Sequence, residues 1–313
     1  MIWLIGTGNI GTVYANILNE LNVDYIAIGR GEASALKFKE TTGHDVITGG
    51  LEKYLSSKPA LPEKAIVTVR TKDLAKVEIA LMEYGVKVIL CEKPGYYHIS
   101  ELDTLEAAVK KHNAKLYIAY NRRFYASTLK AEEIIKEDGG VTSFNFEFTE
   151  WIRLFQNRVG DYPETLFYAN SSHVVDLAFF LGGFPKEMSC YTADSIPWHN
   201  PAIFAGAGMS EKGALFSYQA NWKAPGRWAV EILTSKHRLY FKPMETLQIQ
   251  QMDTVKVEPV EIDDSLDKQF KPGFYLETKA FLNDDFERFC TFEQQLEHVK
   301  NYYMKMGKPS KAE

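Results

Sequence analysis

A carboxylate and an amine stand next to each other where a buried strand is predicted to end. The apolar run 86–90 leads directly into Cys91-Glu92-Lys93-Pro94. Because Pro94 cannot join a β-ladder and fixes its own φ, the strand stops there and Lys93 is held at its end. A lysine in this place points toward the crevice where parallel sheets bind ligands. It has the chemistry to hold a hydroxyl and to stabilise a developing alkoxide, and the alternative is an ordinary exposed lysine at a strand end.

A glycine-rich turn near the start of the chain has the pattern of a phosphate-binding loop. It follows the predicted strand 2–5 and opens a predicted helix, where amide N–H groups bind phosphates. The first glycine makes the tight turn, the second admits a pyrophosphate, and the third lets the helix pack closely. We therefore predict binding of a dinucleotide, NAD or NADP, and the alternative is a glycine turn that binds nothing. The predicted contacts are Gly6, Thr7, Gly8, Asn9, Ile10 and Gly11.

The end of the second predicted strand bears on the choice of dinucleotide. An acidic residue there binds the ribose hydroxyls of NAD, but this chain has Gly29-Arg30-Gly31. An arginine in this place favours a 2′-phosphate, hence NADP. In the alternative, Arg30 stacks on the adenine and Glu32 reaches the ribose.

Polar residues also stand at the start of an otherwise apolar predicted helix. His173 and Asp176 are three residues apart and share a helix face. Because buried polar groups need partners, these two side chains either bind a substrate with several hydroxyls or have a structural role.

Arg122 and Arg123, at the junction of two sequence patterns, are expected either to clamp a substrate or to lock two domains together. We expect the tryptophans Trp151, Trp198, Trp222 and Trp228 to pack in the core and the sheet.

The composition is that of an ordinary globular chain. Its 313 residues are 45% hydrophobic and 25% charged, enough to bury a core and to form two domains. The net charge of −5 argues against a nucleic-acid partner, and no apolar run is long enough to span a membrane. The three cysteines are scattered and show no metal-ligand spacing, so we expect free thiols, no metal and a cytoplasmic location. The first residues enter a strand without a basic leader, so we expect no export signal.

Two sequence patterns divide the chain near Tyr120. Before it, strands and amphipathic helices alternate, which predicts a parallel sheet with right-handed crossovers. After it, a period of two predicts a large, mostly antiparallel sheet with one wet face. The predicted strands are 2–5, 24–28, 65–69, 86–91, 116–119, 143–151, 187–193, 214–222, 228–234, 238–241 and 246–250. The predicted helices are 9–21, 32–42, 72–84, 100–112, 126–137 and 171–181, with two more within 274–306.

The order of these motifs resembles the glucose–fructose oxidoreductase/inositol dehydrogenase/rhizopine-catabolism (Gfo/Idh/MocA) family of oxidoreductases. The similarity extends over nearly the whole chain and includes the glycine loop, 85–94, 120–124, 173–177, 181–183 and 222–228. It implies an α/β fold with a doubly wound Rossmann domain at 1–120. It also implies a substrate-binding and oligomerisation domain at 121–313 with a large, mostly antiparallel open sheet, through which a homodimer or homotetramer forms. The implied reaction is hydride transfer between a nicotinamide and a sugar or cyclitol carbon.

Carried over residue by residue, the resemblance makes Lys93 the catalytic lysine and His173 the catalytic acid/base. The family often has an aspartate four residues before this histidine, where the present chain has Ala169. The proton relay then lacks a carboxylate unless Tyr168 or Asn170 substitutes for it.

A second departure concerns the loop after the third long strand of the first domain. The family's threonine-proline-asparagine sequence is replaced by Val69-Arg70-Thr71. Arg70 is therefore a new charge, expected close to the nicotinamide half of the cofactor.

The sequence predicts an NAD(P)-dependent dehydrogenase or reductase acting on a secondary alcohol or ketone of a sugar, sugar derivative or cyclitol. One alternative is a non-catalytic NAD(P)-binding sensor on the same fold, and the other is a reductase of a non-sugar acceptor, as in the biliverdin reductases. A small sugar-like molecule is the expected partner, and neither nucleic acid nor membrane is. Besides the catalytic pair and the glycine loop, the predicted site residues are Asp176, Arg123, Tyr168 and Asn170 for substrate and Arg30, Arg70, Glu92 and Lys93 for cofactor.

Overall fold

The computed structural model describes residues 1–155 and 165–308. The chain divides into two compact units, each built from two stretches of sequence. The first unit combines Met1–Asn121 with Leu266–Leu296, and the second combines Arg122–Ser265 with Glu297–Glu313. In the described part of the chain, none of the helices has the length and apolar character needed to cross a membrane.

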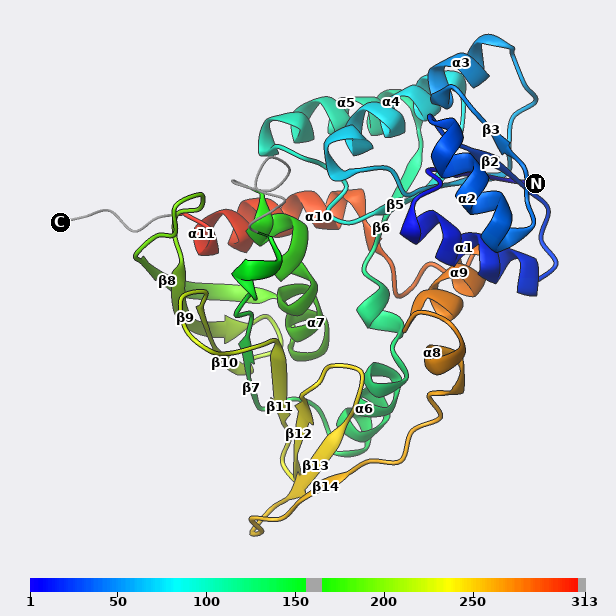
Figure 1. Cartoon of the computed structure of the whole chain (residues 1–313). Helices are drawn as coiled ribbons and strands as arrows, with labels where there is room; N and C mark the ends of the chain where they lie inside the picture. Colours follow the sequence, from blue (N-terminus) through cyan, green and yellow to red (C-terminus); the bar gives the residue numbers. More distant parts are fainter. Residues whose placement is uncertain (156–164, 309–313) are drawn as a thin grey trace. The chain divides into compact units, whose positions relative to one another are not determined.

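The first unit is built on a seven-stranded sheet with the order β15-β6-β5-β4-β1-β2-β3 (Figure 1). The six strands β1 to β6 are parallel, and the short edge strand β15 runs antiparallel to β6. The strand order reverses between β1 and β4, which is where doubly wound sheets bind ligands. The strands are β1 (Ile2–Ile5), β2 (Tyr25–Ile28), β3 (Val46–Ile47), β4 (Lys64–Val67), β5 (Val88–Glu92), β6 (Lys115–Ala119) and β15 (Cys290–Thr291).

Helices lie in two groups beside this sheet. Helices α1, α2 and α9 lie together, and α4 lies along α5 (Figure 1). The helices are α1 (Asn9–Glu20), α2 (Glu32–Thr42), α3 (Gly50–Ser56), α4 (Leu74–Tyr84), α5 (Leu102–His112), α8 (Ser265–Gln269) and α9 (Phe274–Leu282). Single 3₁₀ turns precede α4 and α5, at η1 (Thr71–Asp73) and η2 (Ile99–Glu101), and a third, η3 (Asn121–Phe124), follows β6. The helix α10 (Phe292–His298) carries the chain from the first unit to the second.

The returning segment Leu266–Leu296 completes the first unit. The Tyr14 hydroxyl in α1 donates to Glu277 Oε2 over 2.9 Å, and Lys64 Nζ in β4 donates to the Phe281 carbonyl over 2.7 Å. The ring of Tyr117 in β6 stacks on Phe286 with centroids 4.4 Å apart. Helix, sheet and edge strand of the first unit are therefore all held by residues from near the end of the sequence.

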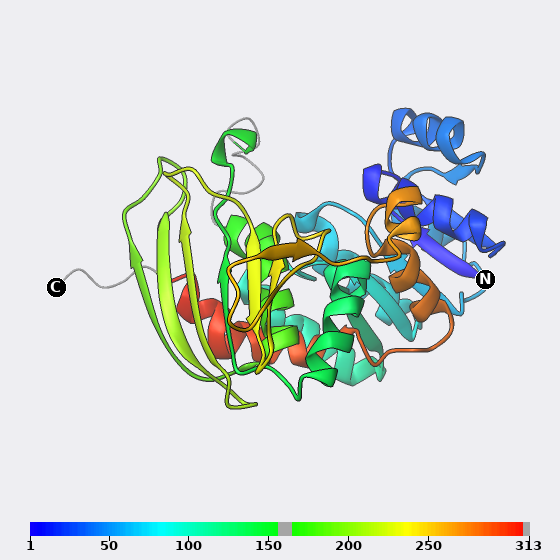
Figure 2. The same ribbon diagram turned by 90° about the horizontal axis from the view of Figure 1, so that it is seen from below.

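The second unit is built on an eight-stranded sheet with the order β14-β13-β12-β11-β7-β10-β9-β8. All neighbouring strands are antiparallel except β7 and β10, which run parallel. Figure 2 shows the described helices of this unit on one side of the sheet, and the other face carries none. The strands are β7 (Ser143–Glu147), β8 (Pro185–Ala193), β9 (Ile203–Ser210), β10 (Leu215–Asn221), β11 (Ala229–Leu233), β12 (His237–Phe241), β13 (Gln248–Gln251) and β14 (Val257–Pro259).

The helix that covers this sheet is apolar nearly all round. Helix α7 (Ser172–Gly182) packs on β7 and β11, and its buried residues include Val174, Val175, Leu177 and Phe179. The other helical segments of this unit are α6 (Ala126–Glu137), η4 (Ile152–Leu154), the π-helical turns η6 (Phe167–Ser171) and η7 (Val299–Tyr303), and α11 (Met304–Met306). The two sheets confirm the predicted fold class, a doubly wound parallel sheet followed by a large, mostly antiparallel open sheet.

Candidate functional site

The glycine loop packs tightly against the end of β4. Gly6 has φ +110°, and a Cβ on it would lie 2.7 Å from the carbonyl carbon of Thr68. A Cβ on Gly11 would lie 2.0 Å from the Gly6 carbonyl oxygen, so this position has no room for a side chain. Gly8 is not packed against other atoms in this way. A Cβ there would meet no atom within 4 Å, so this position of the loop borders open space.

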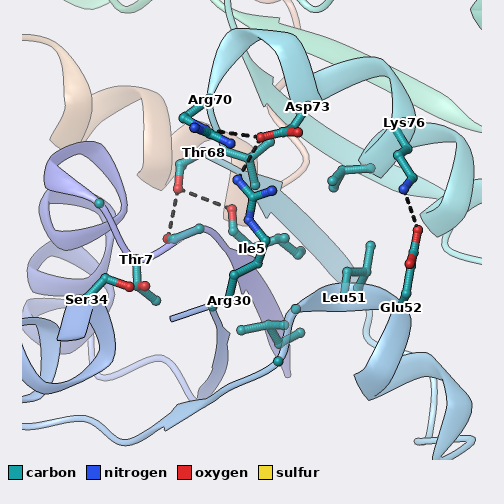
Figure 3. Close-up of a pocket in the computed structure, with 18 of the residues that line it drawn as sticks. Ile5, Thr7, Arg30, Ser34, Leu51, Glu52, Thr68, Arg70, Asp73 and Lys76 are labelled. Carbon is teal, nitrogen blue, oxygen red and sulfur yellow. Dashed lines mark hydrogen bonds and ion pairs between the residues drawn. The ribbon is translucent and has the colours of Figure 1, made fainter. Parts of the chain in front are cut away.

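A pocket of about 500 Å³ opens beside this loop (Figure 3). Its walls come from the ends of β1, β2 and β4, from the start of α3 and from α4. Residues on these walls include Gly6, Thr7, Gly8, Arg30, Gly50, Leu51, Thr68, Arg70, Val77 and Ala80.

The donors at the start of α1 fit the phosphates of a dinucleotide. Helix α1 begins at Asn9 after Gly8, with no side-chain cap and no acidic residue in its first turn. The first amide N–H groups of the helix therefore keep their positive end toward the pocket. The pocket, the open Gly8 and the uncapped helix together fit NAD or NADP, and contact of Gly6–Gly11 with the pyrophosphate stays a prediction.

Two arginines share one carboxylate at the wall of this pocket. Arg30 Nη2 lies 2.7 Å from Asp73 Oδ2, and Arg70 Nε lies 3.3 Å from the same oxygen (Figure 3). Both arginine side chains are more than half exposed, so their guanidinium groups reach solvent. The turn η1 places Asp73 between Arg70 and Arg30, and the expected proximity of Arg70 to the nicotinamide half stays a prediction.

The predicted catalytic lysine follows β5 directly. Glu92 ends the strand, Lys93 is partly buried, and neither is among the residues that line the pocket. The carbonyl of Pro94 accepts a 3.1 Å hydrogen bond from Gln295 Nε2. Gln295 Oε1 in turn accepts a hydrogen bond from the Tyr120 hydroxyl over 3.1 Å. The strand end that carries Lys93 is thus anchored by the returning segment of the chain.

A buried carboxyl group lies behind this strand. Glu78 of α4 is fully buried, and its Oε1 accepts a hydrogen bond from the Cys91 thiol. Burial raises the pKa of Glu78 to about 8, and the Cys91 hydrogen bond opposes that shift. Glu78 is therefore largely protonated at neutral pH.

In the second unit, the predicted acid/base residue stands at the start of α7. His173 is partly exposed and is the second residue of α7, which directly follows the π-helical turn Phe167–Ser171. Burial raises the pKa of Tyr168, in this turn, to about 12, so its hydroxyl stays protonated at neutral pH. Ala169 is buried and offers no polar group.

A carboxylate from another element lies beside this turn. The fully buried side chain of Glu150 accepts 2.9 Å and 2.7 Å hydrogen bonds from Asn170 Nδ2 and the Ser171 hydroxyl, respectively. Glu150 was not predicted as a site residue, although the sequence pattern around it indicates a buried carboxylate. Phe144, Phe146, Phe148 and Glu150 share the same phase of an alternating segment, so a carboxylate falls on its buried side.

Arg123 and Asp176 bind each other. Arg123 Nη2 lies 2.6 Å from Asp176 Oδ1, and Arg123 Nε lies 2.9 Å from Oδ2, with both side chains almost fully buried. Burial raises the pKa of Asp176, and the Arg123 guanidinium opposes that shift. A substrate reaches either group only if this pair opens, so substrate contact by Arg123 or Asp176 stays a prediction.

Two further arginines gather around Trp228. The guanidinium carbons of Arg227 and Arg122 lie 4.1 Å and 4.9 Å from its ring centroid. The ring of His173 lies 6.1 Å from the same ring. Trp151, expected in the core, is 53% exposed and lies 4.5 Å from the Arg227 guanidinium.

The charges in this cluster interact. Burial lowers the pKa of Arg227, the Glu150 carboxylate opposes this shift, and the positive charge of Arg122 adds to it. Arg227 Nη1 lies 3.7 Å from Glu150 Oε2, so this ion pair is loose. Neither Arg227 nor Trp228 was predicted as a site residue, and their position in the segment 222–228 was the available signal.

The match to known proteins is clearest in the first unit. Residues 1–120 match the Gfo/Idh/MocA family model, described as the oxidoreductase family with an NAD-binding Rossmann fold. No curated protein matches the chain significantly.

Solved structures share the fold over almost the whole chain. A levoglucosan dehydrogenase in complex with NADH and levoglucosan is 18% identical with a TM-score of 0.71, covering 92% of this chain and 89% of its own. A UDP-N-acetylglucosamine 3-dehydrogenase from Acidithiobacillus ferrooxidans is 14% identical with a TM-score of 0.73, covering 98% and 97%. The WlbA dehydrogenase from Chromobacterium violaceum, in complex with NADH and UDP-GlcNAcA, is 17% identical with a TM-score of 0.72, covering 97% and 93%. At these identities the likeness concerns the fold.

Proposed function

Because residues 1–120 match the Gfo/Idh/MocA family model of oxidoreductases, we propose that this chain is an NAD(P)-dependent dehydrogenase that acts on a sugar, sugar derivative or cyclitol. When bound, the nicotinamide exchanges a hydride with the carbon of a secondary alcohol or ketone. The observation that carries the proposal is the pocket beside the glycine loop, where the uncapped start of α1 and the open Gly8 fit a dinucleotide.

In this proposal, residues 1–120 bind the cofactor and residues 121–313 bind the substrate. Thr7, Asn9 and Ile10 belong to the cofactor loop, and Arg30, Arg70 and Glu92 complete the proposed cofactor contacts. We favour NADP, because Arg30 presents an exposed guanidinium where an acidic residue would repel the 2′-phosphate.

Lys93 holds the reacting hydroxyl and stabilises its developing negative charge. A partly buried amine at an anchored strand end is suited to this role, because its position varies little. His173 takes or returns the proton at the substrate oxygen. Tyr168, which stays protonated, and Asn170 offer hydrogen-bond donors to substrate hydroxyls.

We assign the missing family carboxylate to Glu150. It occupies the space beside Asn170 and Ser171, next to the position where Ala169 stands in the sequence. A carboxylate there stabilises a positively charged imidazole at the same helix start through the low-dielectric interior.

The second unit also presents a surface for assembly. One face of sheet β10-β9-β8 is exposed and includes Ser189, Tyr191, Ala205, Ala207, Leu215, Ser217 and Gln219. Small and apolar residues on a flat face suit sheet-on-sheet packing, so we propose a homodimer or homotetramer through this face. The three cysteines are free thiols, as in a reducing compartment, and we propose a cytoplasmic location.

A substitution at Lys93 tests the catalytic proposal. Lys93→Met removes the charge and keeps most of the side-chain volume, so turnover on a responsive sugar falls by at least about 10²-fold, or roughly 2.7 kcal/mol of transition-state stabilisation. Cofactor binding, followed by nicotinamide fluorescence, stays unchanged, because the glycine loop carries the phosphates. Lys87→Met, just before the same strand, is the control and keeps full turnover.

Cofactor binding without turnover would contradict the proposed activity. A chain that binds cofactor but turns over no sugar, cyclitol or nucleotide-sugar is a sensor and not a dehydrogenase.

A further inference from the structure

The Arg122 guanidinium lies against aromatic rings and makes no close ion pair with the described residues. In the part of the chain that the structure describes, its nitrogen atoms make no hydrogen bond and no ion pair, and its Nε is buried. The group is instead held by aromatic rings, with its carbon 4.9 Å from the Trp228 centroid and 5.6 Å from the Tyr125 centroid. Because a buried donor without an acceptor is unfavourable, a ligand that supplies an acceptor to Arg122 would be stabilised here.

The second guanidinium on Trp228 is only loosely neutralised. Arg227 lies 4.1 Å from the Trp228 centroid and 3.7 Å from its nearest carboxylate oxygen, which is beyond hydrogen-bond distance. That carboxylate, Glu150, already accepts short hydrogen bonds from two neighbours in the turn before His173. The Arg227 side chain is 39% exposed, so its head remains accessible from solvent.

Two positively charged groups are held on one aromatic ring. Arg123 and Asp176 form a close bidentate pair, whereas Arg227 has Glu150 at 3.7 Å and only a smaller electrostatic interaction with Glu245. Stacking on aromatic rings fixes the planar groups, so little side-chain freedom is lost when they bind a ligand. Such guanidinium groups match the oxygen atoms of a carboxylate or phosphate.

We propose that Arg122 and Arg227, held on Trp228, form an anion subsite beside His173, and that the substrate is an acidic sugar derivative. This inference rests on the proposed function, because it assigns the substrate class of the same site. The ligand group is an anionic oxygen cluster, either the carboxylate of a sugar acid or the phosphate of a sugar phosphate. A neutral sugar leaves both guanidinium groups without an acceptor and binds more weakly.

Matched sugars test the subsite. The whole chain, loaded with NADPH or NADH, is titrated calorimetrically with an aldose, its uronate and its 6-phosphate in the gluco, galacto and manno series. In at least one series, an acidic member binds roughly 10- to 100-fold more tightly than the neutral aldose. The preferred member identifies the anion as a carboxylate or a phosphate.

Three variants and one control assign the preference to these residues. Arg122→Met and Arg227→Met remove most of the preference for the acid while leaving the affinity for the neutral aldose and the cofactor unchanged. Arg122→Lys, which keeps the charge, retains part of the preference and guards against a folding defect in the methionine variants. Lys130→Met removes one exposed positive charge from α6 in the same unit and leaves the preference intact.

Several results would overturn the inference: equal affinity for acid and aldose in every series, absence of binding in all of them, or a preference that survives both methionine variants. Weakened cofactor binding in these variants would also overturn it, by assigning the arginines to the cofactor. Turnover of the same sugars separates the two proposals. Arginine-dependent binding of an acid without turnover refutes the dehydrogenase and supports the subsite, whereas turnover of neutral sugars without acid preference does the reverse.

Discussion

Exchange of Arg30 tests the choice between the two nicotinamide cofactors. The guanidinium lies at the pocket wall, where the 2′-phosphate of NADP would meet it, but it already binds Asp73 over 2.7 Å. A new charge-assisted contact contributes about 1.5–3 kcal/mol. Since the Arg30 side chain is 60% exposed, the ion pair with Asp73 that must loosen contributes only about 0.2–1 kcal/mol. The net preference for NADPH over NADH is therefore about 1–2 kcal/mol, or roughly 5- to 30-fold in Kd.

The two partners of this ion pair have opposite effects on cofactor choice. Arg30→Ala removes the phosphate contact, so the Kd values for NADPH and NADH become nearly equal. Asp73→Asn removes the competing carboxylate and one negative charge near the phosphate, so NADPH binds roughly two- to fivefold more tightly. Lys39→Met is the control, because it removes an exposed positive charge from α2 outside the pocket.

Nicotinamide fluorescence titrations at low salt and at about 0.15 M salt measure these constants. The difference between the cofactors shrinks with salt, because an exposed charge pair is screened. Equal Kd values for both cofactors in the unmutated chain would refute the reasoning. So would an Asp73→Asn variant that loses affinity for NADPH, since the carboxylate would then support binding and not compete with it.

Three further outcomes follow from buried and catalytic groups. Because the pKa of Glu78 is raised from 4.5 to about 8, folding favours its protonated form. The free energy of unfolding by urea therefore falls by on the order of a few kcal/mol as the pH rises from about 4.5 through about 8. Glu78→Gln removes this dependence, and the same pH dependence in the unmutated chain and in the variant would contradict the reasoning. Arg123→Met leaves the buried Asp176 carboxylate unpaired and costs about 3–5 kcal/mol of stability. The double variant with Asp176→Leu recovers most of that loss, and a double variant as unstable as the single one would be inconsistent with a paired role. His173→Ala lowers turnover by roughly 10²–10⁴-fold with an unchanged cofactor Kd, and unaltered turnover would remove His173 from the mechanism.

Local patterns in the sequence are sufficient to predict most of the fold. Helix α2 begins and ends as predicted at Glu32 and Thr42, and α6 does so at Ala126 and Glu137. The strand β9 was missed, because Ile203–Ser210 is rich in glycine and alanine and has Ile203 as its one β-branched residue. The predicted strand 143–151 ends earlier, at Glu147.

The site was harder to predict than the elements that carry it. A motif indicates which residue types stand at a strand end or a helix start, so the glycine loop and Lys93 were recognisable. It does not indicate which side chains from distant segments meet, and Asp73, Glu150 and Arg227 acquire their partners only through folding. The return of 266–296 to the first unit also has no local signal, since its helices resemble any other amphipathic segment.

The return of this late segment has a consequence for the order in which the chain folds during synthesis. A ribosome produces the glycine loop and the first six strands well before Glu277, Phe281 and Gln295 exist. Until then Lys64 lacks its carbonyl partners, the edge of β6 is uncovered, and the carbonyl of Pro94 lacks its amide donor. An exposed strand edge is a template for pairing with other chains, so the nascent first unit is the stage most sensitive to aggregation. The first unit therefore gains these stabilising contacts only after almost the whole chain has been made.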